Sequence, residues 1–106
     1  MKYANKAVSV APEILKRKLG GELFEPITIT QFLQGVCKAG SPIGADGRIA
    51  NTSSAIGILL YDVYEENPNG SLVKAFAVIN ELNANKNADL TIADAVKTAL
   101  PNLVFE

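Results

Sequence analysis

The sequence predicts an α+β, mainly β protein: a small antiparallel β-barrel or sandwich with one or two short helices. Three observations support this fold class. Residues 56–63 (Ile-Gly-Ile-Leu-Leu-Tyr-Asp-Val) are apolar at nearly every position, as in a strand that is covered on both faces. Segments rich in Gly, Pro, Asn and Asp lie on either side and favour chain reversals. Helical patterns are short and lie near the two ends, at 12–19 and 91–100.

The length of 106 residues is typical of one domain. We expect residues 1–11 to form an N-terminal arm and residues 12–106 a single β-rich domain, with a radius of gyration of about 13 Å. A hydrophobic fraction of 48% and a charged fraction of 20% are ordinary for a folded globular protein.

Residues 12–19 have two interpretations. Pro12 at the first helical position, Glu13 in the first turn and basic residues before the glycines favour a short helix, which we expect. The alternative is an extended arm that leads to a turn at Gly20–Gly21. Residues 27–30 alternate Ile and Thr, which predicts a strand. Residues 31–36 fit either a helical turn or an irregular approach to the next strand.

Two turns follow an extended segment at 36–38. Proline presets φ in the first turn, at 40–42, and Asp46-Gly47 tolerates the positive φ of the second. We expect 48–50 to be a short return strand and 51–54 a polar loop. The residues of this structural turn motif are Gly40, Ser41, Pro42, Gly44, Asp46 and Gly47.

A reversal at 65–70 ends in Asn69-Gly70, a pair that adopts the positive φ of tight hairpin turns. We therefore expect 56–64 and 71–79 to form an antiparallel hairpin. Residues 80–89 contain four asparagines and are predicted to be a loop.

The C-terminal segment predicts a helix followed by a strand. Thr91 is the expected N-cap, with Asp94 at the capping-box position. A core-facing stripe recurs at four-residue spacing in Ile92, Val96 and Leu100. Pro101 ends the helix, and 103–105 reads as a final strand.

Few residues offer catalytic chemistry. The chain has no histidine and one cysteine, which excludes a histidine-based triad, a histidine metal site and an internal disulfide. We expect Cys37 to be a small buried core residue. Asp62, Glu65 and Glu66 could ligate a metal ion, but their place at a turn favours a solvated hairpin tip. We expect no enzyme, no catalytic residue, no metal and no cofactor; a metal-dependent hydrolase or nuclease built on Asp62 is the minority alternative.

The charge is unevenly distributed. The net charge of −1 argues against nucleic acid as the main ligand, and no apolar run has the length of a signal peptide core or a membrane span. Residues 1–18 carry a balance of +4 and residues 49–106 a balance of −4. A basic beginning could dock on an acidic protein surface or on a neighbouring copy, and the simpler interpretation is solvated surface charge. For Tyr3, Tyr61 and Tyr64 we expect packing rather than stacking on a ligand.

Two segments resemble a pattern of tailed-phage head-decoration and head-fibre proteins. Residues 38–47 (Lys-Ala-Gly-Ser-Pro-Ile-Gly-Ala-Asp-Gly) are similar to an Ala-Gly-Thr-Pro-(Ile/Leu)-Gly turn, with Ser41 in the place of threonine. Residues 55–63 (Ala-Ile-Gly-Ile-Leu-Leu-Tyr-Asp-Val) are similar to the strand that follows this turn. The closing segment 94–105 is similar to the helix, proline turn and strand of the head-fibre group. The resemblance covers 36–79 well, 91–105 moderately and 1–35 hardly at all.

The resemblance implies a virion structural protein that binds the outer surface of a capsid, where it stabilises the shell or anchors a fibre. It implies the major capsid protein as partner, self-association with a trimer favoured, synthesis in the host cytoplasm, and no nucleic-acid or membrane partner. The alternative is a small non-catalytic protein-binding module or an inhibitor of a host protein. The candidate capsid-docking or arm residues are Lys2, Tyr3, Lys6, Lys16, Arg17 and Lys18.

Overall fold

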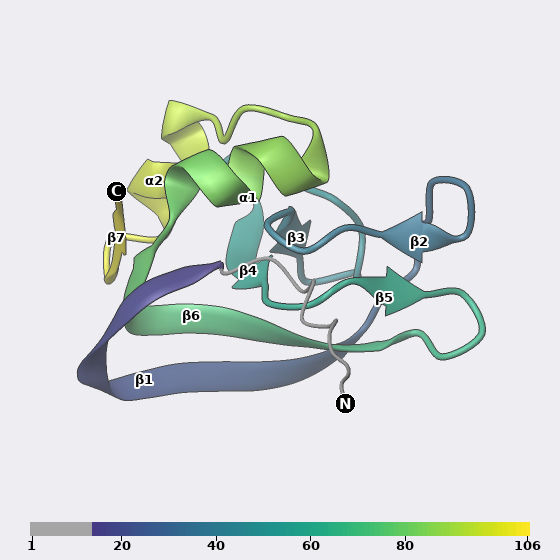
Figure 1. The fold of residues 1–106 in the computed structure, drawn as a ribbon, viewed down its shortest axis with the longest axis horizontal. Helices are drawn as coiled ribbons and strands as arrows, with labels where there is room; N and C mark the ends of the chain where they lie inside the picture. The colour runs from purple at the N-terminus through teal and green to yellow at the C-terminus, as the bar shows by residue number, and fades with distance from the viewer. Residues whose placement is uncertain (1–13) are drawn as a thin grey trace, which may run out of the picture.

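The computed structural model describes residues 14–106, so the predicted N-terminal arm lies outside the described residues. Their radius of gyration is 13.5 Å, close to the value expected for one domain. Figure 1 shows β-strands covered on one side by two short helices. In chain order the elements are β1 (Leu15–Thr28), β2 (Val36–Cys37), β3 (Pro42–Gly44), β4 (Ala55–Leu59), β5 (Val63–Tyr64), β6 (Asn69–Ile79), α1 (Glu81–Ala88), α2 (Asp94–Ala99) and β7 (Leu103–Phe105).

The strands form two sheets, and the predicted mainly β class is confirmed. Five strands make the larger sheet in the order β1-β6-β4-β3, with β7 paired parallel to β6; β2 and β5 make a small antiparallel sheet. The path from β1 to β3 does not close on itself within the described residues. The fold is therefore a sandwich rather than a barrel, with the helices as a further layer.

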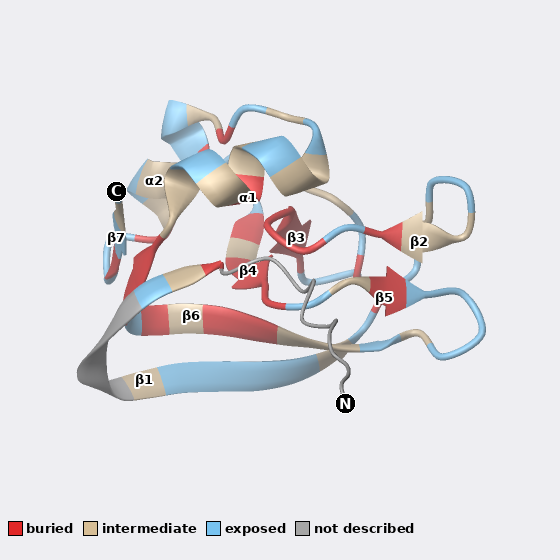
Figure 2. Cartoon of the chain, in the orientation of Figure 1, coloured by how far each residue is buried: buried red, intermediate tan, exposed pale blue. Residues whose placement is uncertain are grey.

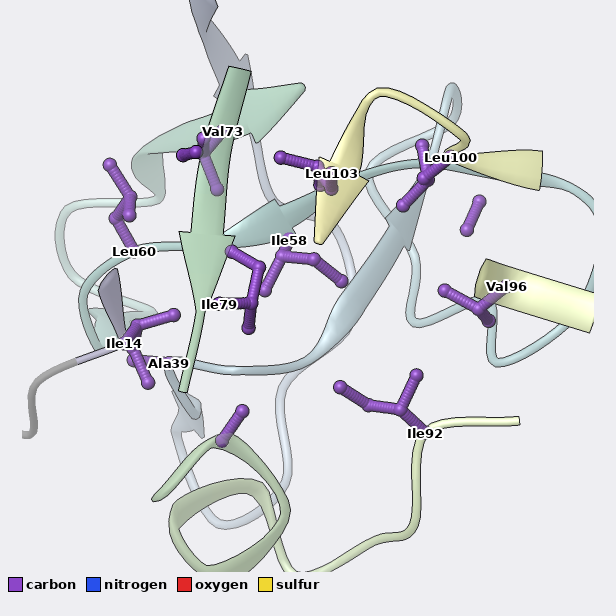
Figure 3. Packing of buried hydrophobic residues seen from close by; sticks show 13 residues of the cluster. Ile14, Ala39, Ile58, Leu60, Val73, Ile79, Ile92, Val96, Leu100 and Leu103 are labelled. Atoms are coloured by element: carbon purple, nitrogen blue, oxygen red, sulfur yellow. The ribbon is translucent and has the colours of Figure 1, made fainter. Parts of the chain in front are cut away.

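Two hydrophobic cores lie on opposite faces of the larger sheet. Consecutive strand residues point to opposite faces, so Ile58 of β4 enters one core and Leu59 enters the other. The larger core is shared with α1, α2 and β7, and Figure 3 shows its side chains meeting around Ile58 and Ile79. The smaller core joins the larger sheet to β2 and β5 and includes Cys37, which confirms its predicted burial. Figure 2 shows that much of β4 and β6 is buried, and both strands contribute residues to each core.

The helix predicted at 12–19 is wrong, because the described part of that segment lies in β1 and pairs with β6. Leu15 lies opposite Ile79 and Lys18 opposite Ala77. An isolated eight-residue helix is marginal in water, and pairing with a strand satisfies the backbone better. The alternative, an extended segment that leads to a turn at Gly20–Gly21, is closer to the structure: these glycines lie within β1 at an irregularity in its pairing with β6, where the strand turns sharply (Figure 1).

The predicted hairpin of 56–64 and 71–79 is confirmed in its antiparallel pairing, and the reversal lies within the predicted 65–70, but Asn69-Gly70 does not form it. Ile58 lies opposite Val73 in the antiparallel β4–β6 pair. The apolar run then leaves the sheet at 60–62, and the chain reverses at 65–66 instead of at Asn69-Gly70. Gly70 lies within β6 and does not adopt the left-handed conformation of a tight hairpin turn. A Cβ on Gly70 would lie 2.9 Å from Val63 Cγ2, so this glycine lets the two sheets approach.

The loop predicted at 80–89 is wrong because most of it forms α1. Asn80 caps the helix by accepting the Asn83 backbone N–H at 3.2 Å, and Asp89 ends it in the left-handed conformation (φ +56°). The helix packs against the larger core through Ala84. The asparagines that favour a turn in the sequence serve here as caps and bracing groups.

The predicted C-terminal helix is confirmed, but it begins later than expected. Its N-cap is Ala93 rather than Thr91, and no side chain caps it. Asn51 holds the preceding backbone extended, because its amide donates to the Thr91 carbonyl at 2.8 Å and its carbonyl accepts the Ala93 N–H at 2.9 Å. The helix ends before Pro101, and the stripe of Ile92, Val96 and Leu100 is buried as expected.

Candidate functional site

The first predicted turn exists, but it lies two residues earlier than expected. The Ser41 N–H donates to the Lys38 carbonyl at 3.3 Å, and Gly40 has φ +94°, as the third residue of a type II turn requires. Pro42 therefore begins β3 instead of shaping the turn. The expected return strand at 48–50 is reduced to one bridge, between Ile43 and Ile49.

The second predicted turn is confirmed at 44–47. The Gly47 N–H donates to the Gly44 carbonyl at 3.0 Å, and Gly47 has φ +81°. The Asp46 carboxylate accepts the Arg48 N–H at 3.1 Å, which stabilises the turn from within. The Thr30 N–H donates to the Gly47 carbonyl at 3.0 Å, so the turn is joined to the end of β1. The hydrogen bonds of both turns therefore hold the fold together.

Asp62 joins the first turn to α1. Its carboxylate accepts the Ala39 N–H at 2.8 Å and the Asn87 side-chain amide at 3.1 Å, and Lys38 lies 3.9 Å from its second oxygen. The same Asn87 amide donates to the Ala39 carbonyl at 2.8 Å. The carboxylate is partly buried, where hydrogen bonds to a charged acceptor are strong. Asp62 therefore acts as a brace between three segments that are distant in the sequence.

Replacing Asp62 with alanine is expected to lower the free energy of unfolding by about 2 kcal/mol, because the Ala39 N–H loses its acceptor. Asp62→Asn keeps an acceptor oxygen and should lose less. Urea unfolding measures both values, with the exposed Glu66→Ala as the control that should change by less than about 0.5 kcal/mol. Equal stability of Asp62→Ala and the wild type would refute the bracing role.

The predicted acidic cluster is not brought together as a metal site. Glu65 and Glu66 are exposed at the reversal, whereas Asp62 is turned toward Ala39 and Asn87. No group of three His, Cys, Asp or Glu residues within 14–106 is placed to hold a metal ion. The packing expected of the tyrosines is wrong for Tyr61 and Tyr64, which are 63% and 54% exposed; Tyr3 lies outside the described residues.

The pKa of the Cys37 thiol lies above its ordinary value. Burial raises the pKa of its thiol from 9.0 to about 11, and the negative charge of Asp62 adds to the rise. The thiol is 1% exposed and stays protonated at neutral pH. This environment is that of a core residue.

The raised pKa of Cys37 predicts a loss of stability at high pH. The unfolded chain releases the thiol proton near pH 9, whereas the folded chain keeps it up to about pH 11. The contribution is complete below pH 9 and is lost as the pH rises toward 11, by about 1 kcal/mol at pH 10. Urea unfolding at pH 8 and pH 10 should show a smaller pH dependence for Cys37→Ala than for the wild type. Parallel pH profiles of the two proteins would contradict the assignment.

A tight hairpin that the sequence left undecided presents an exposed leucine. Gln34 and Gly35 have φ +55° and +82°, and Leu33 and Val36 exchange backbone hydrogen bonds of 2.9 and 3.2 Å. These values describe a two-residue type I′ loop, so the interpretation of 31–36 as a helical turn is excluded. Leu33 is 77% exposed on this loop. The sequence signal for this loop is the pair Gln34-Gly35 between the apolar residues Leu33 and Val36.

A hollow of about 210 Å³ lies between this loop and the end of α1. Leu33, Val36, Ile49 and Ala88 give it apolar walls, and Lys38 and Asp89 give it charged edges. We call this space the tip hollow. An exposed apolar side chain, Leu33, and a concave site coincide here.

The predicted docking residues lie only partly within the described chain. Lys16 is in β1 and forms an ion pair of 3.5 Å with Glu106. Arg17 and Lys18 also belong to the backbone of β1. The remaining three, Lys2, Tyr3 and Lys6, lie outside the described residues.

Neither helix in residues 14–106 is long and apolar enough to cross a membrane. Comparison of the chain with protein-family models, with curated proteins and with solved structures finds no match.

Proposed function

We propose that this chain is a structural protein of a tailed-phage virion that binds the outer surface of the capsid, where it stabilises the shell or anchors a fibre. The observation that carries the proposal is the resemblance of 38–47 and 55–63 to head-decoration and head-fibre proteins. The two segments are neighbours in space, since Pro42 lies opposite Ile58 and Ile43 opposite Gly57. The resemblance thus concerns one contiguous part of the fold rather than scattered residues. The hydrogen bond from the Ala39 N–H to the Asp62 carboxylate also joins the two segments.

Exposed apolar side chains support a role in protein binding. Leu23 and Phe24 lie on β1, at one edge of the larger sheet, and each is about half exposed. Leu33, Tyr61 and Tyr64 lie on or beside the small sheet. Large apolar and aromatic side chains of this kind are enriched at protein interfaces. The major capsid protein is the proposed partner, together with further copies of this chain, as a trimer.

Co-sedimentation with phage heads tests the proposal. Binding to heads of the cognate phage should saturate at a fixed copy number per capsid, and bound protein should raise the temperature at which the heads disassemble, by mass action. Reversing the charges of the basic group on β1, in the variant Lys16→Glu/Arg17→Glu/Lys18→Glu, should weaken binding. The control is Lys86→Glu on α1, which changes charge elsewhere. Failure to bind both immature and expanded heads would overturn the proposal.

The tip hollow favours one alternative, a soluble protein-binding module or an inhibitor of a host protein. An apolar concavity beside exposed Leu33 fits a side chain of a single partner. This alternative predicts a stoichiometric complex with one soluble protein and no retention on capsids.

A further inference from the structure

The outer face of the small sheet is apolar although it faces away from the smaller core. Cys37 and Val63 are paired and buried, so the next pair, Val36 and Tyr64, lies on the opposite face. Leu33 is bridged to Val36 and shares that face. Leu33 and Tyr64 are both more than half exposed. This face and the tip hollow, which share Leu33 and Val36, form one surface that lacks a cover among the described residues.

The rim of this surface is acidic. Asp89 lines the tip hollow, and the Glu65 N–H donates to the Gly35 carbonyl at 3.0 Å, which places Glu65 beside the hairpin loop. Lys38 is the one cation that lines the hollow, and it already faces Asp62 at 3.9 Å. Within residues 14–106, no ion pair joins a cation to Glu65 or Asp89. An occupant that combines apolar side chains with positive charge would complement this surface.

The chain contains one segment of that chemistry outside the described residues. Residues 1–11 carry Lys2 and Lys6 and no acidic residue, with Tyr3, Val8 and Val10 as apolar side chains. Residues 1–13 come before the buried Ile14, and a fully extended segment of thirteen residues spans about 45 Å. The body measures 45 Å along its longest axis, so the segment is long enough to reach an adjoining copy.

We infer that the tip hollow receives residues 1–11 of a second copy of this chain, with apolar side chains of the segment in the hollow and its lysines beside Glu65 and Asp89. This contact gives the self-association proposed above a defined surface. The inference rests on that self-association but not on capsid binding. It joins copies head to tail, and such contacts form a closed ring when the rotation between copies permits.

Charge exchange between two variants tests the inference in solution. Sedimentation equilibrium of the full chain at low salt should show self-association. Lys6→Glu and Glu65→Lys should each raise the dissociation constant about tenfold, because each places like charges together. An equimolar mixture of the two variants should recover association, since the segment of each then meets a body of opposite charge. The double variant Lys6→Glu/Glu65→Lys should recover it without mixing.

A matched pair of leucines separates the apolar contact from general surface effects. Leu33→Ser should weaken association at least tenfold, and Leu82→Ser on α1, which removes an equally exposed leucine, should leave it unchanged. A monomeric wild-type protein would overturn the inference, as would a mixture that does not recover association. Recovery in the double variant alone would show that the segment occupies its own chain. Saturable capsid binding by a protein that is monomeric in solution would leave the proposed function standing.

Discussion

Replacing Gly40 with alanine is expected to lower the free energy of unfolding by about 3–5 kcal/mol, as the sum of backbone strain and steric overlap. Gly40 has φ +94°, where an L side chain is strained. A Cβ at this position would lie 2.7 Å from both Cα and the carbonyl oxygen of Ala84. These are backbone atoms of α1, and Asn87 ties the same helix to Ala39 and Asp62. The helix therefore cannot yield without loss of those hydrogen bonds.

Gly35→Ala provides the matched control for this prediction. Gly35 also has a positive φ, of +82°, but nothing lies within 4 Å of a Cβ built on it. Its alanine variant should therefore lose only the strain, about 1 kcal/mol. Urea unfolding of both variants separates the two contributions. Equal losses at Gly35 and Gly40 would contradict the close packing of α1 on the turn.

Leu59→Ala should be the second most damaging change, with a loss of about 2–5 kcal/mol. The Leu59 side chain is fully buried in the smaller core, where it packs with Leu72 and Val63. The surrounding strands belong to two sheets and cannot both move inward, so most of the cavity should persist. The control is Leu82→Ala, which truncates an exposed leucine and should change stability by less than about 0.5 kcal/mol.

The same variant tests whether the two cores unfold together. Ile58 and Leu59 are adjacent residues of β4, so a loss in one core acts on the strand that also carries the other. Tyrosine fluorescence and far-UV circular dichroism should report one coincident transition in urea, with the slope of the wild type. Two separate transitions for Leu59→Ala would show that the cores are independent units.

The sequence predicted the elements whose signals are local. Residues 55–59 are apolar on both faces because β4 lies between β3 and β6 with a core on each side. Pro101 ends α2 because a helix interior cannot accommodate its ring, and the stripe at Ile92, Val96 and Leu100 needs only helical spacing to be recognised. The burial of Cys37 followed from its lack of a chemical partner.

The errors arise where a distant segment decides the structure. Residues 15–19 carry helix signals, but their partner strand begins only at Asn69, and its pairing outweighs local propensity. Asn69-Gly70 has the composition of a turn, yet Gly70 is needed where Val63 and Leu59 would meet a side chain. The tip hollow is formed by a hairpin and a helix end that meet only in the folded chain, so no linear motif identifies it. The phage resemblance stays a prediction.

The pairing of β1 with β6 has a consequence for synthesis on the ribosome. β1 is the first described strand to leave the exit tunnel, but its partner among the described strands, β6, spans 69–79. At about 5–20 residues per second, β1 waits several seconds before that partner emerges. During this interval its backbone hydrogen-bonding groups and the side chains of Leu23 and Phe24 are open to other nascent chains. Pro26, which offers no N–H, lies in the middle of the strand's second half and reduces its use as a template for intermolecular pairing.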